Sequence, residues 1–261
     1  MELIRVIIGE LPIIHRRMND ELSSKQIIKE VPMGIDLKKE QQASIDRPRQ
    51  KYSITSRIFF WSMNLITGKK TTLAKAKLIE MLASIPYRAW EIRQYARLTR
   101  CYRKPDKVQK AQSIMAWGRE AQDNEYWHLI VINEKMKADG IKDPWYLFLP
   151  IPFLMIASYV VMTRIMALLS IRSAFKFNAH FEDHAEHVYA QFVEDNPELE
   201  NQSVDNEKVR EYLAGYKEDI TTWADVFRRI GLDERDHMNN SFVYCGKPER
   251  VVQYEGMEKS D

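Results

Sequence analysis

The chain is poor in cysteine and in net charge. It carries two cysteines, Cys101 and Cys245, among 261 residues, and they form neither a disulfide framework nor a CxxC pair. Its formal net charge is +2, whereas proteins that bind nucleic acids usually carry a marked basic excess or a basic stripe. We therefore expect no disulfide scaffold, no thiolate metal site and no nucleic-acid partner.

A hydrophobic run long enough for a secretory signal is missing from the N-terminus, because Glu2, Arg5 and Glu10 interrupt its apolar residues. The same acidic residues make the segment a poor organelle transit peptide, so we expect either peptide to be absent or already removed. The chain is 45% hydrophobic and 29% charged, which is typical of a folded globular protein. Its length indicates one large domain or at most two.

Alternation of β-branched and polar residues is also scarce, so the sequence predicts an all-α protein. Thr72 is the expected N-cap of a long helix, and Pro86 is expected to kink that helix. Further helices are expected over residues 108–137, 173–195 and 206–216, and from about residue 221. We divide the chain into an N-terminal arm with a short helix or two (1–55), a helical domain (56–245) and a C-terminal tail (246–261).

Two Glu-x-x-His motifs are the main chemical signal in the sequence. One such pair is weak evidence, because residues three apart on a helix can share a hydrogen bond at the surface. Here each pair follows a glutamate on an earlier apolar-rich helix, in the order Glu80, Glu125 with His128, Glu182, Glu234 with His237. The order Glu, ExxH, Glu, ExxH is the ligand set of a four-helix bundle that binds two iron or manganese ions.

The chemistry explains these residue types. Carboxylates are hard ligands that favour iron or manganese, imidazole suits iron, and the i, i+3 spacing lets one helix bring both groups to one metal ion. Without a metal, four ionised glutamates in one core would carry a large desolvation cost or take up protons. The set therefore predicts a ferritin-like four-helix bundle with a carboxylate-bridged di-iron site.

Three histidines and a tyrosine accompany Glu182 on its expected helix. His180, His184 and His187 lack the three-residue spacing from Glu182, so we interpret them as surface groups or as neighbours of the site. Tyr189 lies seven residues, almost two turns, after Glu182 and therefore on the same helix face. It is either an ordinary core tyrosine or a group that donates an electron and a proton during O2 cleavage.

Residues 145–163 form an uncharged stretch of 19 residues, close to the ~20 that a spanning helix needs. Pro150 and Pro152 weaken it as a spanning helix, and a full crossing would place Glu125 and Glu182 toward opposite faces of a hydrocarbon layer ~30 Å thick. We interpret the stretch as a monotopic helix lying partly in one leaflet, or as a helix buried in the bundle. A basic cluster is then either a solvated helix face or a contact with anionic head groups. Its members are Arg88, Arg93, Arg97, Arg100, Arg103, Lys104, Lys107 and Lys110.

Four motifs resemble those of the alternative oxidases, the membrane-bound di-iron quinol oxidases of mitochondria and some bacteria, and especially their plastid terminal oxidase branch. IEMLASIPY is similar to the family's LET motif, NEYWHL to its NERMHL or NEMHHL, FEDHAEHVY to its third, glutamate-rich motif, and LDERDH to its DEAHH or DDEAEH. The resemblance covers about residues 60–245 in the family's order, with no useful match before them.

The resemblance implies a role for each matching residue. Glu125 and Glu234 would bridge two iron ions, and Tyr189 matches the family's redox-active tyrosine. Asn124 and Asp233 match residues that surround the ligands. The metal site that it implies consists of Glu80, Glu125, His128, Glu182, Glu234 and His237, with the two histidines either bound to the irons or just outside the bound ligands. The quinol pocket that it implies is lined by Lys75, which stands where the family usually has Arg, and by Ile79, Phe181, Ala185 and Val188.

The function that we predict is a cyanide-resistant quinol:O2 oxidoreductase that reduces O2 to water without pumping protons. The resemblance implies two iron ions, ubiquinol or plastoquinol as the substrate, contact with one lipid leaflet, and a homodimer. We expect a monotopic protein of the mitochondrial inner membrane, with the thylakoid or a bacterial inner membrane as alternatives. Two other functions stay open: a di-iron hydroxylase or ferroxidase, and a non-catalytic subunit of a membrane complex.

Overall fold

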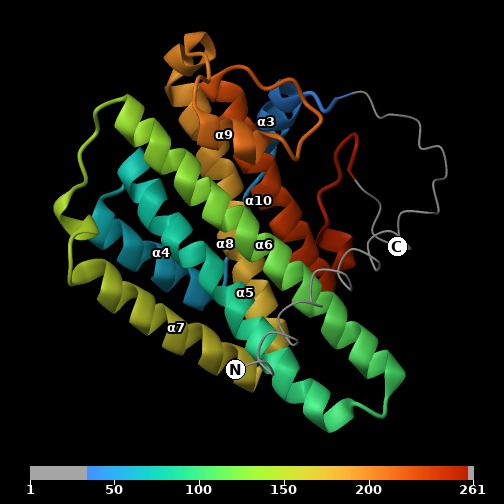
Figure 1. Ribbon diagram of the computed structural model, residues 1–261. Helices are drawn as coiled ribbons and strands as arrows, with labels where there is room; N and C mark the ends of the chain where they lie inside the picture. The colour runs from blue at the N-terminus through green and yellow to red at the C-terminus, as the bar shows by residue number, and fades with distance from the viewer. Residues whose placement is uncertain (1–33, 258–261) are drawn as a thin grey trace, which may run out of the picture.

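The fold is helical throughout the part of the chain that the structure describes, residues 34–257 of a computed structural model (Figure 1). Within these residues there is no strand, and the nearest approach to one is an isolated antiparallel bridge between Ser203 and Thr222. The prediction of an all-α protein is therefore confirmed. The helices are α3 (Leu37–Asp46), α4 (Ile54–Thr67), α5 (Leu73–Cys101), α6 (Pro105–Ala138), α7 (Ile151–Leu169), α8 (Ile171–Asp195), α9 (Glu207–Leu213) and α10 (Trp223–Cys245), with short 3-10 turns η1 (Trp145–Leu147), η2 (Pro197–Asn201) and η3 (Pro248–Arg250).

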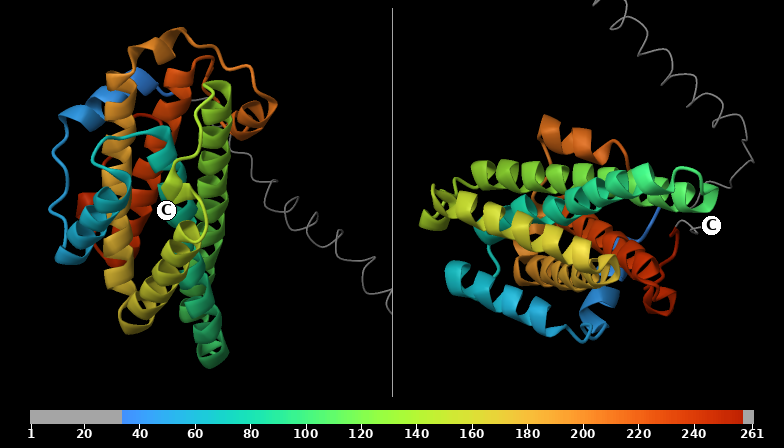
Figure 2. Two further views of the ribbon diagram at one scale, coloured as in Figure 1. Left: turned by 90° about the vertical axis from the view of Figure 1, so that its left-hand side faces the viewer. Right: turned by 90° about the horizontal axis from the view of Figure 1, so that it is seen from below.

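Four long helices, α5, α6, α8 and α10, form the bundle. Helix α5 packs along α6 and α8 packs along α10, and Figures 1 and 2 show the four helices side by side. The helix ends follow local sequence signals: the Thr72 hydroxyl accepts a hydrogen bond from the Lys75 backbone N–H at 3.2 Å, as expected for an N-cap. Gly140, with φ of 66°, follows the end of α6. Pro86 lies inside α5, which continues on both sides of it.

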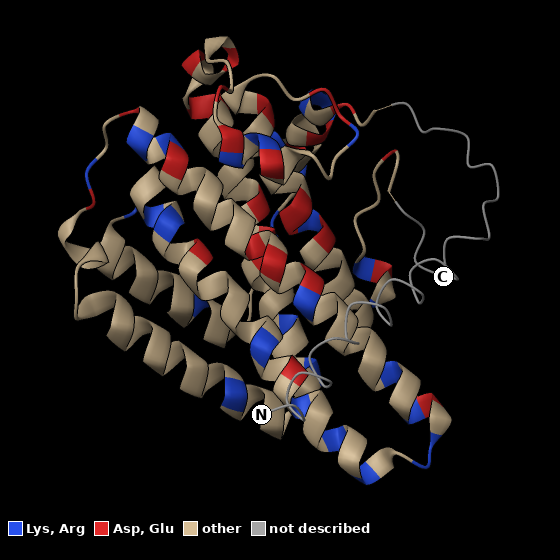
Figure 3. Ribbon diagram, in the orientation of Figure 1, with Lys and Arg blue, Asp and Glu red and all other residues tan. Residues whose placement is uncertain are grey.

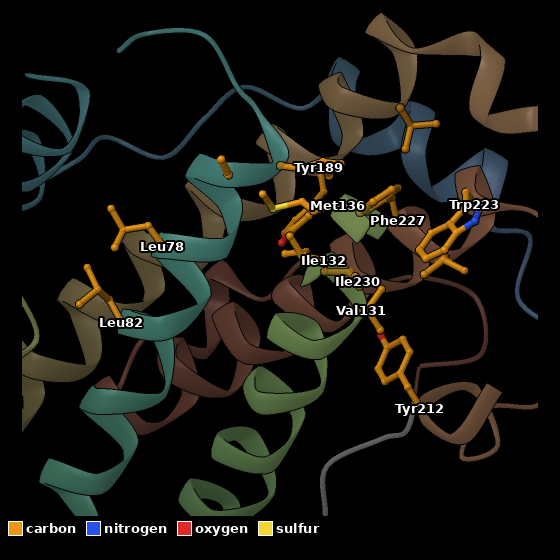
Figure 4. Packing of buried hydrophobic residues seen from close by; sticks show 14 of the residues in the cluster. Leu78, Leu82, Val131, Ile132, Met136, Tyr189, Tyr212, Trp223, Phe227 and Ile230 are labelled. Atoms are coloured by element: carbon orange, nitrogen blue, oxygen red, sulfur yellow. The ribbon is translucent and has the colours of Figure 1, made fainter. Parts of the chain in front are cut away.

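Two clusters of buried apolar side chains hold the bundle together. The first includes Leu78, Ile132 and Phe227, and Figure 4 shows residues of this cluster from several helices pointing toward one another. The second is aromatic and includes Trp90 and Phe175. The four predicted ligand helices all contribute to these clusters. Burial on this scale fixes the helices relative to one another, so side chains between the clusters are held in place.

Part of the expected N-terminal arm is folded against the bundle. Helix α3 packs on α8 and α10, where Arg235 donates hydrogen bonds to Glu40 and Ser44. Arg47, just after α3, donates to Asp183 and Glu186 of α8, both at 2.6 Å. Residues 34–55 are therefore tied to the domain, while the rest of the predicted arm, with the signal and transit peptide expectations, lies outside the described residues.

The helix in the apolar stretch after α6 begins later than the uncharged residues 145–163 suggest. Trp145 starts the short turn η1, and α7 begins at Ile151 and continues six residues beyond Thr163, past Arg164. Pro150 and Pro152 thus mark the start of the helix, where proline is tolerated. Helix α7 is long and apolar enough to cross a membrane by length and composition, and only 22% of its apolar window is buried. The alternative of a helix wholly buried in the bundle is therefore wrong.

Candidate metal centre

The six predicted ligands come together in the middle of the bundle. Their side chains are all buried, and the least buried of them, His237, is 6% exposed. One set of ligand atoms, lying within 4.8 Å of one another, comes from Glu80, Glu125, His128 and Glu234. A second such set comes from Glu125, Glu182, Glu234 and His237. The two sets share Glu125 and Glu234, so two neighbouring metal positions would have two carboxylates in common.

The imidazoles lie among the carboxylates. His128 Nδ1 is 3.2 Å from Glu234 Oε1 and 3.5 Å from Glu125 Oε2. His237 Nδ1 is 2.9 Å from Glu125 Oε1. Each histidine lies one helical turn after the glutamate of its own motif, so the Glu-x-x-His spacing brings both groups to the same region of the core.

The unsatisfied atoms of this cluster fit a pair of metal ions. Buried polar atoms in folded proteins nearly always have hydrogen-bond partners, yet every one of the six ligands has a buried side-chain atom without one. These atoms are Glu80 Oε2, both carboxylate oxygens of Glu125, His128 Nδ1, Glu182 Oε2, Glu234 Oε2 and His237 Nδ1. Oxygen and imidazole nitrogen are the donors that iron and manganese accept. The donor set therefore fits the di-iron centre that the sequence predicts.

In Glu80 and Glu182, the carboxylate oxygen that is not left unpaired accepts hydrogen bonds from neighbouring side chains. Tyr189 donates a hydrogen bond to Glu80 Oε1. Glu182 Oε1 accepts hydrogen bonds from the Tyr87 hydroxyl and from Asn178 Nδ2, both at 2.8 Å. Such contacts fix the orientation of a ligand and leave its other donor atom free for a metal.

Asp233 fixes the ring of His128. Its Oδ2 lies 3.1 Å from His128 Nε2 and accepts hydrogen bonds from Tyr212 and Tyr216 at 2.7 Å and 2.6 Å. Although burial acts to raise it, the pKa of Asp233 lies well below its usual value, because Arg229 and the hydrogen bond with His128 favour the carboxylate. His128 Nε2 thus faces a permanent negative charge, which leaves Nδ1 to face the glutamates. Asn124 Nδ2 also lies near this carboxylate, 3.3 Å from Oδ2.

Burial and crowding shift the pKa values of the ligands themselves. Burial, together with the nearby charges of Glu234 and Glu125, raises the pKa of Glu182 well above its usual value. Although burial acts to lower them, the carboxylates that surround His128 and His237 raise the pKa of both histidines. In the absence of a metal, protons would therefore neutralise part of the charge in this core.

A cavity adjoins the ligand set. All five residues expected around a quinol line it, together with Glu80, Tyr189 and other side chains. The expected residues are Lys75, Ile79, Phe181, Ala185 and Val188, and the others include Phe59, Phe60, Met63, Asn64, Ala76 and His184. Lys75 Nζ donates hydrogen bonds to Asn64 Oδ1 at 2.6 Å and to the Gly68 carbonyl at 2.9 Å. Burial lowers the pKa of Lys75.

The remaining histidines of α8 lie outside the ligand set. His180 Nδ1 accepts a hydrogen bond from the Ser53 backbone N–H at 3.2 Å, and His184 stacks on Phe60. His187 belongs to a third acidic group with Asp183 and Glu186. Because the carboxylates of that group bind Arg47 and Arg235, they already have cationic partners and are not free for a metal.

Two kinds of residue escaped the sequence analysis. Tyr87, whose hydroxyl contacts Glu182, lies seven residues after Glu80, which is the same spacing that singled out Tyr189. It could have been found by applying that rule to both helices. The aromatic residues of α4 that close the cavity, Phe59 and Phe60, carry no comparable signal, because no ligand precedes them on their helix.

Comparison with known proteins agrees with the geometry of the site. The model of the alternative oxidase family matches residues 24–243, while no curated protein matches the chain. The match begins well before residue 60, so the expectation that no useful similarity precedes residue 60 is wrong. Helices α3 and α4, which contact α8 in the fold, fall within the matched segment. The ligand set, its buried position in an all-helical bundle and the extent of this match show that the chain belongs to the alternative oxidase family.

Proposed function

We propose that this chain is a quinol oxidase that reduces O2 to water, without pumping protons and without inhibition by cyanide. Alternative oxidases act on quinol and O2 at a di-iron centre, which supports this reaction. The observation that carries the proposal is the cavity between α4, α5 and α8, because its wall includes both Glu80 and Tyr189. A quinol in this cavity would lie against Glu80, one of the proposed metal ligands.

Six side chains of this site would hold two iron ions. When bound, iron supplies the electron-transfer steps and the position for O2. Glu125 and Glu234, which belong to both sets of ligand atoms, are the carboxylates that would bridge the two ions. His128, held by Asp233, and His237 would each complete one side of the pair.

Quinol oxidation releases protons as well as electrons, and Tyr189 and Glu80 are placed to handle the protons. Both residues line the cavity, and the Tyr189 hydroxyl donates a hydrogen bond to Glu80 Oε1. A proton from the quinol could therefore pass along this hydrogen bond toward the ligand set. At another part of the wall, Lys75 uses two N–H donors for Asn64 and Gly68, which leaves one of its three donors for a quinol oxygen.

We propose that α4 and α7 lie in one leaflet of a membrane. Alternative oxidases are membrane-associated proteins. The two helices contact each other through Phe59 and Tyr159, whose ring centres are 5.2 Å apart, and they lie along one side of the molecule (Figures 1 and 2). They expose apolar side chains that a lipid layer would cover. The residues concerned are Ile54, Ile58, Trp61, Leu65, Phe153, Leu154, Val161, Ile165, Leu168 and Leu169.

This placement gives the quinol a route to the site. Quinols are carried in the lipid phase, and residues of α4 form part of the cavity wall. The substrate could then enter from the leaflet without crossing water. We propose ubiquinol or plastoquinol as substrate and the mitochondrial inner membrane as the location, with the thylakoid or a bacterial inner membrane as alternatives. The homodimer is likewise proposed from family membership alone, and the plastid-type branch stays a prediction.

The deciding experiment is O2 uptake by the purified, detergent-solubilised chain supplied with a short-chain quinol. We expect uptake that resists cyanide and about two irons per chain, the number that this ligand set holds. Glu125→Gln keeps the side-chain volume but removes a ligand shared by both positions, so it should lose both iron and uptake. Glu120→Gln, on an exposed position of the same helix, is the matched control and should keep both.

Three results would contradict the proposal. Iron-loaded protein without quinol-dependent uptake would favour a hydroxylase or ferroxidase. Protein without iron and without uptake would favour a non-catalytic subunit of a membrane complex. Uptake that survives Glu125→Gln would show that the electrons do not pass through the proposed ligand set.

A further inference from the structure

An aromatic chain runs from the ligand set toward the protein surface. It begins at Tyr87 and Trp90 of α5, continues to Trp117 of α6 and ends at Tyr244 of α10. The ring centres of Tyr87 and Trp90 are 4.9 Å apart, those of Trp90 and Trp117 are 5.0 Å apart, and those of Trp117 and Tyr244 are 4.8 Å apart. The last two contacts are stacked, with interplanar angles of 20° and 24°. Electrons move readily between aromatic rings that are this close.

The two ends of this aromatic chain differ in their exposure to solvent. Tyr87 is fully buried and donates a hydrogen bond to Glu182 Oε1 at 2.8 Å, next to the proposed iron pair. Tyr244 is partly exposed. This aromatic chain therefore connects the buried metal site with solvent, through side chains that, together with cysteine, are the easiest in proteins to oxidise by one electron.

The indole N–H groups of this aromatic chain differ from the Tyr87 hydroxyl, because they have no proton acceptor. The indole N–H groups of Trp90 and Trp117 are buried and have no hydrogen-bond partner. An indole that loses an electron becomes a strong acid, but these two have no acceptor for the proton. Their cation radicals would keep the proton and remain strong oxidants, so each could take an electron from the next ring. Tyr87, by contrast, has a carboxylate to receive its proton.

We propose that Tyr87, Trp90, Trp117 and Tyr244 form an electron path that supplies the metal centre from a small-molecule thiol at the surface when quinol is absent. This inference rests on the proposed function, because it needs a centre that reduces O2. Reduction of O2 to water takes four electrons, of which a pair of ferrous ions stores two. Without quinol, the remaining two electrons must come from another donor. If no path delivered them, the oxidised centre would take them from its own ligands.

The electrons and protons balance along the path. Tyr87 would supply one electron to the iron-loaded site while its phenolic proton shifts to Glu182 Oε1, which accepts its hydrogen bond, and the proton would return when Trp90 re-reduces the ring. Trp117 then reduces Trp90, and Tyr244 reduces Trp117 and loses its proton to water. A thiol gives a hydrogen atom to the Tyr244 radical, and two thiyl radicals combine to a disulfide.

The test follows radicals rather than turnover. Iron-loaded, reduced protein without quinol is mixed with O2, frozen at intervals, and examined by electron paramagnetic resonance and optical absorption. Tyr244→Phe removes the exit, so we expect an indole cation radical to accumulate in this variant. Adding Trp117→Phe to Tyr244→Phe should abolish the part of that signal that belongs to Trp117 and leave a weaker signal at Trp90.

Trp223→Phe in the Tyr244→Phe protein is the matched control. Trp223 is also buried, but Phe227, which is hard to oxidise, packs between it and Tyr189. This change should leave the indole signal unaltered. In a second readout, peptide mass spectrometry after repeated exposure to O2 should find oxidation at Tyr244 in the unaltered protein. In Trp117→Phe, oxidation should move to Tyr87 and Trp90.

An indole signal that Trp117→Phe leaves unchanged would overturn the inference, as would iron-loaded protein that consumes O2 without forming any indole radical. Quinol-dependent uptake is measured on the same preparations. Indole radicals without such uptake would support the path and overturn the quinol substrate. Uptake without indole radicals would support the quinol oxidase and overturn the path.

Discussion

At the scale of single residues, Asp233 orients a proposed ligand without being a ligand itself. It holds His128 through Nε2 and is paired with Arg229, whose NH2 group is 2.8 Å away. In general, replacing a residue that orients a metal ligand weakens metal binding by about 10- to 100-fold. The position of Asp233 between a ligand and a buried cation therefore predicts two separate losses.

We expect Asp233→Asn to weaken iron binding by roughly 10-fold or more and to lower the free energy of unfolding by about 3 kcal/mol. The stability loss follows from leaving Arg229 buried with fewer partners, although Glu218 and Asp236 stay within 3.7 Å of it. Iron titration and urea unfolding measure the two effects. Tyr216→Phe, which removes only one donor to Asp233, is the control and should change both quantities less. Equal effects of the two variants would contradict this role.

At the scale of elements, the contact between α4 and α8 depends on two neutral histidines. Burial lowers the pKa of His180 to about 4 and that of His184 to about 3. The unfolded chain binds these protons near the ordinary histidine pKa of about 6.5, whereas the folded chain does not. The stabilisation from both groups is therefore complete above about pH 6.5 and decreases as the pH falls toward about 4.

Acidification should accordingly loosen α4 before the rest of the bundle. We expect hydrogen exchange in residues 54–67 to increase between about pH 6.5 and about pH 4.5, beyond the ordinary change in intrinsic exchange rate. In His180→Asn with His184→Phe, the amide oxygen can still accept the Ser53 N–H and an aromatic ring still faces Phe60. This double variant should lose most of the pH dependence. If hydrogen exchange in α4 and in α10 changed with pH in the same way, the two histidines would not control the contact between α4 and α8.

The hairpin between α5 and α6 carries the basic cluster that the sequence shows. Figure 3 shows Lys and Arg along this hairpin, whereas α7 carries a single charged residue, Arg164. If the hairpin contacts anionic head groups, each Lys or Arg near the surface contributes about 1 kcal/mol. A merely solvated hairpin would contribute nothing to lipid binding.

We expect Arg100→Gln with Lys107→Gln to weaken binding to vesicles containing anionic lipid by roughly 10- to 30-fold. Binding to neutral vesicles should change little, because α4 and α7 supply the apolar contact. Trp61→Ser with Phe153→Ser should instead weaken binding to both kinds of vesicle, since both side chains are at least 64% exposed. Sedimentation with vesicles measures each case. Basic-residue variants that bind anionic vesicles normally would support the solvated helix face.

At the scale of the whole molecule, the ligand set places four glutamates and two histidines in one core. Iron that binds only the folded protein adds to its stability by mass action. We expect chelation of iron to lower the Tm of the unaltered protein, because the carboxylates then lose their counter-charge. Thermal unfolding with and without chelator measures the change. The Tm of Glu125→Gln should be low both with and without chelator. If chelation left the Tm of the unaltered protein unchanged, iron would make no contribution to its stability.

Much of the site could be predicted from the sequence, because the helical period is local. The Glu-x-x-His motifs and two earlier glutamates fix which residue types face one core, and the structure brings all six together. The N-cap Thr72 and the end of α6 before Gly140 follow the same kind of local rule. What the sequence did not show is that Asp183, Glu186 and His187 form a further group of ligand-type side chains in the fold.

The sequence by itself determined the all-helical fold and singled out the six candidate ligands, because helix propensity and residue spacing act over a few neighbouring positions. Only the tertiary structure decided which acids are free to bind metal. Arg47 and Arg235, far away in the sequence, neutralise Asp183 and Glu186. Within residues 34–257, the ionisable partners of Glu80, Glu125 and Glu234 are the histidines of the proposed ligand set and not Lys or Arg. Likewise, α4 closes the cavity and Trp117 meets Trp90 and Tyr244 because contacts between distant segments depend on how the helices pack.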